Sequence, residues 1–278
     1  GQMQSAGLLP DPSRGVILKS FVTTPLLERI AAGAGIPCVN TLTGFKWIGR
    51  KLLAYEVAAQ QALGLETVEH RLAPCTQEWP ADYRARMAAY QAVGRVFVWG
   101  AEESYGYLCG EAARDKDATA AALLFCELLA HLAQQGRTVP EYLADLWRQY
   151  GYAQEGLLNL AYPGVEGAAR IARILGALQA APPQHLGGLR VTAVQDFLQG
   201  HLRDAQGEAV PREPFFIFQL EGGSRVAVRA SGTEPKLKAY LFVEEAIRKD
   251  SSLEVAQKAA QQRLERLQTA VQAYLEAL

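Results

Sequence analysis

The first half of the chain alternates between short apolar runs and longer amphipathic segments, which restricts the possible folds more than any other feature. The apolar runs, rich in Val, Ile and Phe, lie at residues 16–22, 36–41 and 95–99. Helical patterns follow at residues 46–61 and 117–135. Strands that alternate with helices build a parallel sheet with helices on both faces, and ligands bind beyond the carboxyl ends of its strands. We therefore expect a three-layer α/β domain with a mostly parallel sheet.

The pattern changes near Gly188, where period-two alternation and turn residues replace the helical pattern. Strands are predicted at residues 215–220, 225–228 and 237–243. A capping box at Ser251 to Glu254 opens a C-terminal helix with one apolar stripe: Leu253, Ala256, Ala260, Leu264, Leu267, Val271, Tyr274 and Leu278. Residues 137–178 look mostly helical and lead into Pro182 and Pro183. The sequence thus predicts two domains, the α/β domain with a helical extension or linker at residues 1–180 and a smaller α+β domain, an antiparallel sheet packed by helices, at residues 181–278.

Composition and charge narrow the possible partners. The chain has 278 residues, of which 49% are hydrophobic, and a formal net charge of -1, so no global positive field attracts nucleic acid or an anionic membrane. Its four cysteines and four histidines are scattered without the short paired spacings of a zinc site. Nothing resembles a signal peptide or a membrane-spanning segment, so we expect a cytoplasmic protein. Because Gly1 resembles a cloning remnant, we expect the chain to be part of a longer protein.

The string VRASGTEPK, which joins two predicted strands, concentrates the groups that bind phosphate. Arg229 and Lys236 carry positive charge, and Ser231 and Thr233 offer hydroxyl donors. Gly232 allows the backbone to turn and bring its N–H groups close to an anion. The alternative is an ordinary polar β-turn, since Ser, Gly, Thr and Pro are common turn residues. Either way, any phosphate binding in this nearly neutral chain must be local.

A second polar segment directly follows the third predicted strand. Glu102 and Glu103 are carboxylates that can accept hydrogen bonds from neighbouring hydroxyls, and Ser104 follows them. The alternative is a solvated acidic turn. Farther along, the string RDKD has too few oxygen ligands for a metal ion, and its Asp117 is better explained as a helix cap.

These strings, together with TLTGFKWIG, occur in an order that resembles the α-D-phosphohexomutases, the phosphoglucomutase/phosphomannomutase superfamily. In that family the phosphate loop reads RPSGTEPK and holds the non-reacting phosphate of the substrate; Ala230 replaces its proline here and removes no phosphate ligand. The resemblance implies five phosphate-binding residues: Arg229, Ser231, Gly232, Thr233 and Lys236. It also implies five residues that contact the sugar: Glu102, Ser104, Thr43, Gly44 and Lys116. It leaves Glu103 without a definite role.

The resemblance runs from about residue 15 to residue 240 and corresponds to the third and fourth domains of a four-domain enzyme. The family's catalytic serine loop and magnesium loop belong to its first two domains and do not occur in this chain. We therefore expect the C-terminal part of a phosphoglucomutase or phosphomannomutase, which interconverts hexose 1-phosphate and 6-phosphate through a phosphoserine and a bisphosphate intermediate. This part would contain no catalytic or metal-binding residue and would be inactive alone.

The resemblance further implies that the full enzyme uses Mg²⁺, glucose 1,6-bisphosphate and the missing N-terminal domains. Three alternatives stay open: a phosphopentomutase of the same superfamily, a stand-alone module that binds sugar phosphates, and a structural dimerisation fragment.

Overall fold

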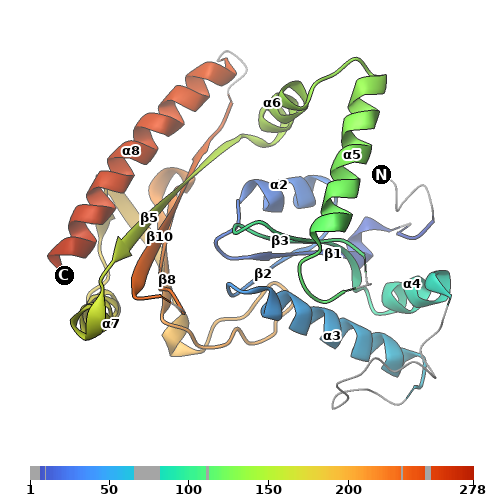
Figure 1. Cartoon of the computed structure of the whole chain (residues 1–278), viewed down its shortest axis with the longest axis horizontal. Coiled ribbons are helices and arrows are strands. Elements are labelled where there is room, and N and C mark those ends of the chain that lie inside the picture. The colour runs from blue at the N-terminus through green and yellow to red at the C-terminus, as the bar shows by residue number, and fades with distance from the viewer. Residues whose placement is uncertain (1–6, 10, 66–81, 111–112, 233, 248–251) are drawn as a thin grey trace. The chain divides into compact units, whose positions relative to one another are not determined.

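The chain forms two compact units, each with a sheet of its own (Figure 1). The computed structural model describes residues 7–9, 11–65, 82–110, 113–232, 234–247 and 252–278. Unit 1 contains the chain up to Thr23, Leu27–Gln134 and Asp204–Gly207, and unit 2 contains Thr24–Leu26, Gln135–Arg203 and Glu208–Leu278.

Unit 1 contains a four-stranded sheet in the order β2, β1, β3, β4. Its strands are β1 (Gly15–Ser20), β2 (Cys38–Thr41), β3 (Val96–Glu102) and β4 (Gly106–Leu108). The central strand β1 is buried along its whole length and runs parallel to β2 and β3, whereas β4 returns antiparallel to β3 as a hairpin. The carboxyl ends of β1, β2 and β3 therefore lie at the same edge of the sheet.

Helices cover both faces of this sheet. They are α2 (Leu26–Gly33), α3 (Phe45–Ala62), α4 (Tyr83–Ala92) and α5 (Ala118–Gln134), and a short 3₁₀ turn, η1 (Pro12–Arg14), precedes β1. Figure 1 shows α2 on one side of the sheet and α3 and α4 on the other. The core of the unit is on the side of α3 and α4, where Val16 and Leu18 of β1 pack with Ile48 and Tyr55 of α3 and Met87 of α4.

The segment Asp204–Gly207 belongs to unit 1 because it binds α3. Lys51 forms an ion pair with Asp204, and both side chains are largely buried. The hydroxyl of Tyr55 donates to Oε1 of Gln206 at 2.8 Å. A polar loop is thus attached to the middle of the helix that begins beside Gly44.

Unit 2 contains a six-stranded antiparallel sheet in the order β5, β10, β9, β8, β7, β6. The strands are β5 (Tyr152–Ala161), β6 (His185–Leu186), β7 (Leu189–Asp196), β8 (Phe215–Leu220), β9 (Arg225–Ala230) and β10 (Lys236–Glu245). The other elements are α6 (Val139–Tyr150), α7 (Gly164–Ala180), α8 (Leu253–Ala277), and the 3₁₀ turns η2 (Phe197–Gln199) and η3 (Glu221–Gly223). The sequence reading missed β5, which lies within the segment expected to be mostly helical.

The core of unit 2 lies between its sheet and the helices α7 and α8. Six residues of the stripe predicted for α8 are buried: Leu253, Ala256, Ala260, Leu264, Leu267 and Val271. The end of the stripe was wrong, because Leu275 is buried there while Tyr274 is half-buried and Leu278 is exposed. The predicted capping box involves Ser251, which lies outside the described residues, and the N-cap of α8 is Ser252.

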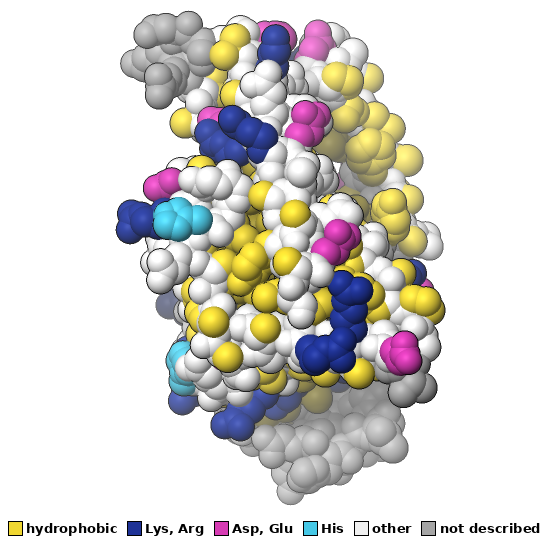
Figure 2. Space-filling model, turned by 90° about the vertical axis from the view of Figure 1, so that its left-hand side faces the viewer, with side chains coloured by type: hydrophobic (Ala, Val, Ile, Leu, Met, Phe, Trp, Pro, Cys, Tyr) yellow, Lys and Arg dark blue, Asp and Glu magenta, His cyan; other side chains and the backbone are white. Residues whose placement is uncertain are grey.

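The predicted fold class is confirmed: a mostly parallel sheet with helices in one unit and an antiparallel sheet with helices in the other. Figure 2 shows one face of the molecule, on which basic, acidic and apolar side chains are interspersed, in keeping with the net charge of -1. Within the described residues, no helix combines the length and apolar character needed to cross a membrane.

Candidate sugar and phosphate loops

Polar residues gather in unit 1 where β1, β2 and β3 end. Ser20 is the last residue of β1, Thr41 the last of β2 and Glu102 the last of β3. The loops that follow these parallel strands emerge at one edge of the sheet, the usual place for a ligand in an open α/β sheet. Two of the loops contain residues that the sequence assigns to sugar binding.

Glu102 is the best-defined group at this edge. Its side chain is buried, and its Oε1 accepts a hydrogen bond from the backbone N–H of Gly44. Gly44 is the N-cap of α3 and has φ 115° and ψ 123°, a conformation that a residue with a Cβ rarely adopts. The glycine therefore allows the loop after β2 to reach the carboxylate at the end of β3.

Burial raises the pKa of the Glu102 carboxyl above its usual value. The hydrogen bond from Gly44 acts in the opposite direction, the neighbouring charge of Glu103 raises the pKa further, and the nearby Lys116 lowers it. Glu102 is thus a carboxylate that is poorly solvated by water yet has a fixed donor at one oxygen.

The loop between β3 and β4 presents Ser104 to solvent. β3 and β4 pair at Glu102 and Gly106, so three residues form the loop. Its last residue, Tyr105, is 88% exposed and has φ 60°, the left-handed conformation common at the end of three-residue hairpin loops. Ser104 and Tyr105 lie at an exposed tip next to the buried Glu102.

Lys116 lies across the base of the same hairpin. A Cβ added at Gly106 would be 3.0 Å from Cδ of Lys116, so the glycine makes room for this side chain. The ammonium group lies 3.1 Å from Oδ1 of Asp115 and 5.3 Å from the centroid of the Phe45 ring. The predicted cap at Asp117 is confirmed, since its Oδ1 accepts from the N–H of Ala120 at 2.9 Å.

The sequence reading missed a polar cluster at the end of β1. Lys19 is completely buried, and its ammonium donates to the carbonyls of Ser20 at 3.2 Å and Thr23 at 3.1 Å. It also forms an ion pair with Glu28 at 2.7 Å. Lysine has three N–H donors, and these three acceptors match them. The ammonium thereby fixes the turn between β1 and α2.

The hydroxyls of this cluster connect it to the β3–β4 loop. Ser20 Oγ lies 2.8 Å from Thr23 Oγ1 and donates to Oε2 of Glu103 at 3.0 Å. Ser20 was read as part of an apolar strand, and no motif marked it. The only sequence signal was a pair of polar residues at the end of that strand.

The predicted phosphate loop lies in unit 2 between β9 and β10. Arg229 is near the end of β9 and Lys236 begins β10, and the N–H of Ser231 donates to the carbonyl of Lys236 at 2.8 Å. Gly232 is exposed and lies in a bend of the backbone, without a positive φ. Thr233 lies outside the described residues.

The two cations of this loop face carboxylates. Arg229 Nε lies 3.7 Å from Oε1 of Glu213, too far for a hydrogen bond, and this buried nitrogen makes none in the described part of the chain. Lys236 Nζ lies 3.0 Å from Oε1 of Glu234. Each cation therefore has an acidic partner that an anionic ligand could replace.

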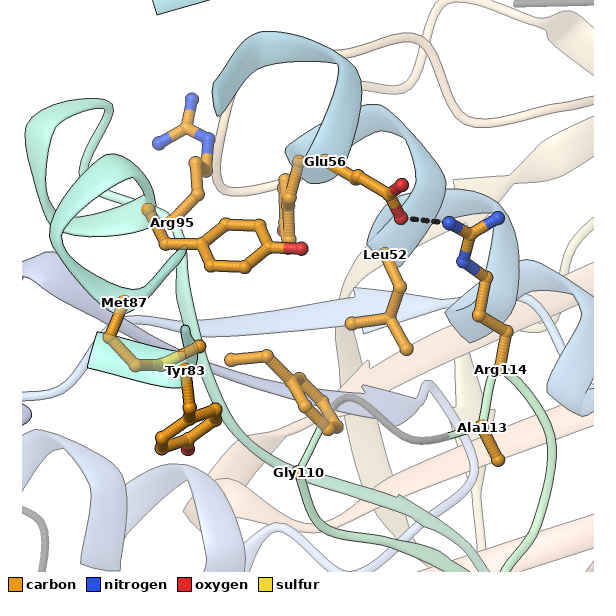
Figure 3. A pocket seen from close by; sticks show the side chains of 11 residues that line it. Leu52, Glu56, Tyr83, Met87, Arg95, Gly110, Ala113 and Arg114 are labelled. Carbon is orange, nitrogen blue, oxygen red and sulfur yellow. Dashed lines mark hydrogen bonds and ion pairs between the residues drawn. The ribbon is translucent and has the colours of Figure 1, made fainter. Parts of the chain in front are cut away.

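A pocket in unit 1 lies away from these loops, among α3, α4 and the start of β3 (Figure 3). Aromatic side chains such as Tyr55 and Phe97 line it, and Arg114 forms an ion pair with Glu56 at its border. The pocket lies beside the amino end of β3, whereas Glu102 is at the carboxyl end of that strand.

In the part of the chain that the structure describes, no three His, Cys, Asp or Glu side chains come together to hold a metal ion. The described residues therefore do not fit a magnesium site.

Comparison with known proteins identifies a family and several relatives. The family profile described as "Phosphoglucomutase/phosphomannomutase, alpha/beta/alpha domain III" matches residues 3–77 and 85–150, about half of the chain. A probable phosphomannomutase of Haemophilus influenzae is 28% identical over 229 residues, which cover 82% of this chain and 36% of that protein. A phosphoglucomutase of Staphylococcus epidermidis is 34% identical over 150 residues, which cover 52% of this chain and 27% of that protein.

A solved structure has a similar fold. The open form of the exocytosis-sensitive phosphoprotein pp63/parafusin, a phosphoglucomutase from Paramecium, aligns with a TM-score of 0.50 and 19% identity. The alignment covers 92% of this chain and 38% of that one. The matched parts of the chain thus span only 27% to 38% of the length of these proteins.

Proposed function

The chain belongs to the phosphoglucomutase/phosphomannomutase family, and we propose that it provides the sugar-recognition and remote-phosphate-binding part of a hexose phosphate mutase. Unit 1 would supply acceptors and donors for sugar hydroxyls from Glu102, Ser104, Thr43, Gly44 and Lys116. Unit 2 would supply the phosphate-binding groups of the loop from Arg229 to Lys236. A hexose phosphate carries both kinds of group.

The observation that carries this proposal is the buried carboxylate of Glu102 at the carboxyl end of β3. One oxygen already accepts from Gly44, while a carboxylate has about four lone-pair positions. The other positions can accept hydrogen bonds from two neighbouring hydroxyls, the arrangement that a sugar ring presents. Because Glu102 is largely removed from water, a sugar hydroxyl would compete with little solvent for these positions.

The phosphate loop supports the same proposal through exchangeable ion pairs. Arg229 is held close to Glu213 without a hydrogen bond from Nε, and Lys236 pairs with the exposed Glu234. A phosphate offers more acceptor oxygens than one carboxylate, so it would satisfy the guanidinium fork better. Ser231, Gly232 and Thr233 would add hydroxyl and backbone donors.

The reaction of the whole protein is part of the proposal. A phosphoserine outside this chain would donate its phosphoryl group to a hexose phosphate, and the resulting glucose 1,6-bisphosphate would return its other phosphate. Mg²⁺ would supply charge neutralisation, and the described residues offer no cluster for it. The residues of this chain would orient the sugar and hold the phosphate that does not react.

Calorimetry with Glu102→Gln tests the proposal. The 278-residue chain should bind glucose 1-phosphate with a Kd on the order of millimolar, because only part of the enzyme is present. The variant should lose about 1.5–3 kcal/mol for glucose 1-phosphate, the usual worth of a hydrogen bond to a charged group, and keep its affinity for inorganic phosphate.

Glu127→Gln, which changes an exposed carboxylate on α5, is the matched control and should bind both ligands like the wild type. Equal losses for both ligands in Glu102→Gln would show that Glu102 is not a sugar acceptor. Absence of glucose 1-phosphate binding by the folded wild-type chain would contradict the proposed function.

A further inference from the structure

We propose that Ser20 and Glu103 form a positioning pair that fixes the β3–β4 loop so that Glu102 and Ser104 can reach the sugar. This inference rests on the proposed function and adds to it two residues to which no sugar contact is assigned. The pair touches no ligand; it acts through its neighbours in the loop.

Two adjacent glutamates contact different loops. Glu102 accepts from Gly44 in the loop after β2, whereas Glu103 accepts from Ser20 at the end of β1. The start of the β3–β4 loop is therefore attached to both neighbouring strand ends. Its tip, with Ser104 and Tyr105, is exposed.

The hydrogen bonds between these hydroxyls run in one direction. Ser20 Oγ has a single hydrogen, and an ionised Glu103 can only accept, so that hydrogen points to Glu103. Thr23 Oγ1 then donates to Ser20 Oγ, 2.8 Å away, in preference to the more distant carbonyl of Ala101 at 3.4 Å. Each hydroxyl in this chain polarises the next, and the charged acceptor at its end strengthens the series.

Ser20, the donor to Glu103, is itself held in place. Ser20 is completely buried, and the carbonyls of Ser20 and Thr23 are held by the ammonium of Lys19. The N–H of Thr23 also donates to the carbonyl of Ser20 at 3.0 Å. A loop that is hydrogen-bonded to such a turn is therefore held in a fixed position. Binding groups must be held to within about 0.5 Å of their working geometry, which such support provides.

The test uses Ser20→Ala, Glu103→Ala and the double variant in the 278-residue chain, with calorimetric titration of glucose 1-phosphate and of inorganic phosphate. Each single variant should weaken glucose 1-phosphate binding about tenfold and leave phosphate binding within about twofold, because only the sugar loop loses its attachment. The double variant should be no weaker than the single variants, since one contact is lost in all three.

Ser20→Thr is the conservative control. It keeps the hydroxyl and should bind glucose 1-phosphate within about threefold of the wild type. If Ser20 acted only through the volume of its side chain, threonine would not preserve binding in this way. Thermal unfolding identifies any variant that is not folded; if Ser20→Ala fails to fold, Glu103→Ala, which changes a side chain nearer the surface, decides the test.

The outcomes separate the two proposals. Wild-type affinity in Ser20→Ala or Glu103→Ala, or losses that add in the double variant, would overturn the positioning pair. If Glu102→Gln loses sugar binding while these variants do not, the proposed function stands and only the pair is wrong. If the folded wild-type chain binds no glucose 1-phosphate, both proposals are wrong.

Discussion

At the scale of single residues, the buried carboxylate of Glu102 is unfavourable for folding, although it suits the proposed sugar contact. Its burial raises the pKa of the carboxyl, so the folded protein holds this proton more tightly than the unfolded chain does. The stabilising effect of the proton is full at low pH and is lost as the pH rises through the folded-state pKa. At neutral pH the buried charge therefore opposes folding, and a ligand hydroxyl that donates to it would relieve part of that penalty.

The same shift predicts a pH dependence of sugar binding. Glucose 1-phosphate affinity, divided by inorganic phosphate affinity, should fall on acidification at a pH above 4.5, the ordinary pKa of a glutamate, because protonation removes the charged acceptor. Titrations of both ligands with Glu102→Gln at the same pH values give the contribution of phosphate ionisation alone. Relative to that variant, the wild-type ratio should fall on acidification. An equal pH dependence in the two proteins would assign the dependence to another group.

The residues at this edge of the sheet differ in how well they could be predicted from the sequence. Glu102 and Gly44 stand in strings with distinctive composition, so their segments could be singled out before their contact was known. The contact itself could not be predicted, because it joins loops 58 residues apart. Ser20 and Lys19 could not be found, since a polar pair at the end of an apolar strand is an ordinary way for a strand to end.

At the scale of elements, the local sequence pattern determines where some strands form, and tertiary contacts determine where others form. β8 has the predicted bounds, because Phe215–Leu220 is a continuous run of apolar and β-prone residues. β5 was missed because Leu157, Leu158 and Gly156 give no strong strand signal. It forms by pairing with β10 along ten residues, some 80 positions later. A Cβ at Gly156 would lie 2.9 Å from Leu264 of α8, so this glycine serves packing.

The helix α8 offers a test of the core of unit 2. Leu267 is 1% exposed within the cluster shared with α7 and the sheet, so Leu267→Ala should lower the free energy of unfolding by about 2–5 kcal/mol. Val255→Ala, at a position on the same helix that is 59% exposed, should change it by less than about 0.5 kcal/mol. Chemical denaturation of both variants measures this difference. Similar losses would mean that the buried face of α8 is assigned wrongly.

At the scale of the whole molecule, the polar loops of the two units belong to different kinds of sheet. The polar loops of unit 1 follow parallel strands, and the phosphate loop of unit 2 is a connection between antiparallel strands. With a net charge of -1 the molecule has no long-range attraction for anions, so the proposed phosphate binding requires the cations of one loop. That requirement makes Arg229 the residue on which the proposed activity of the whole protein most depends.

We expect the 278-residue chain alone to have no mutase activity, and Arg229→Ala to lower kcat/KM about a hundredfold or more in the protein that contains it. The reason is orientation: a bisphosphate that exchanges its two ends must be held by its remote phosphate in both directions. Arg229→Lys should restore only part of the rate, because an ammonium cannot form the bidentate contact of a guanidinium. Arg190→Ala removes an exposed arginine of β7 and is the control with unchanged kinetics. A coupled assay measures all three variants. Turnover by the isolated chain, or wild-type kinetics in Arg229→Ala, would show that the phosphate is anchored elsewhere.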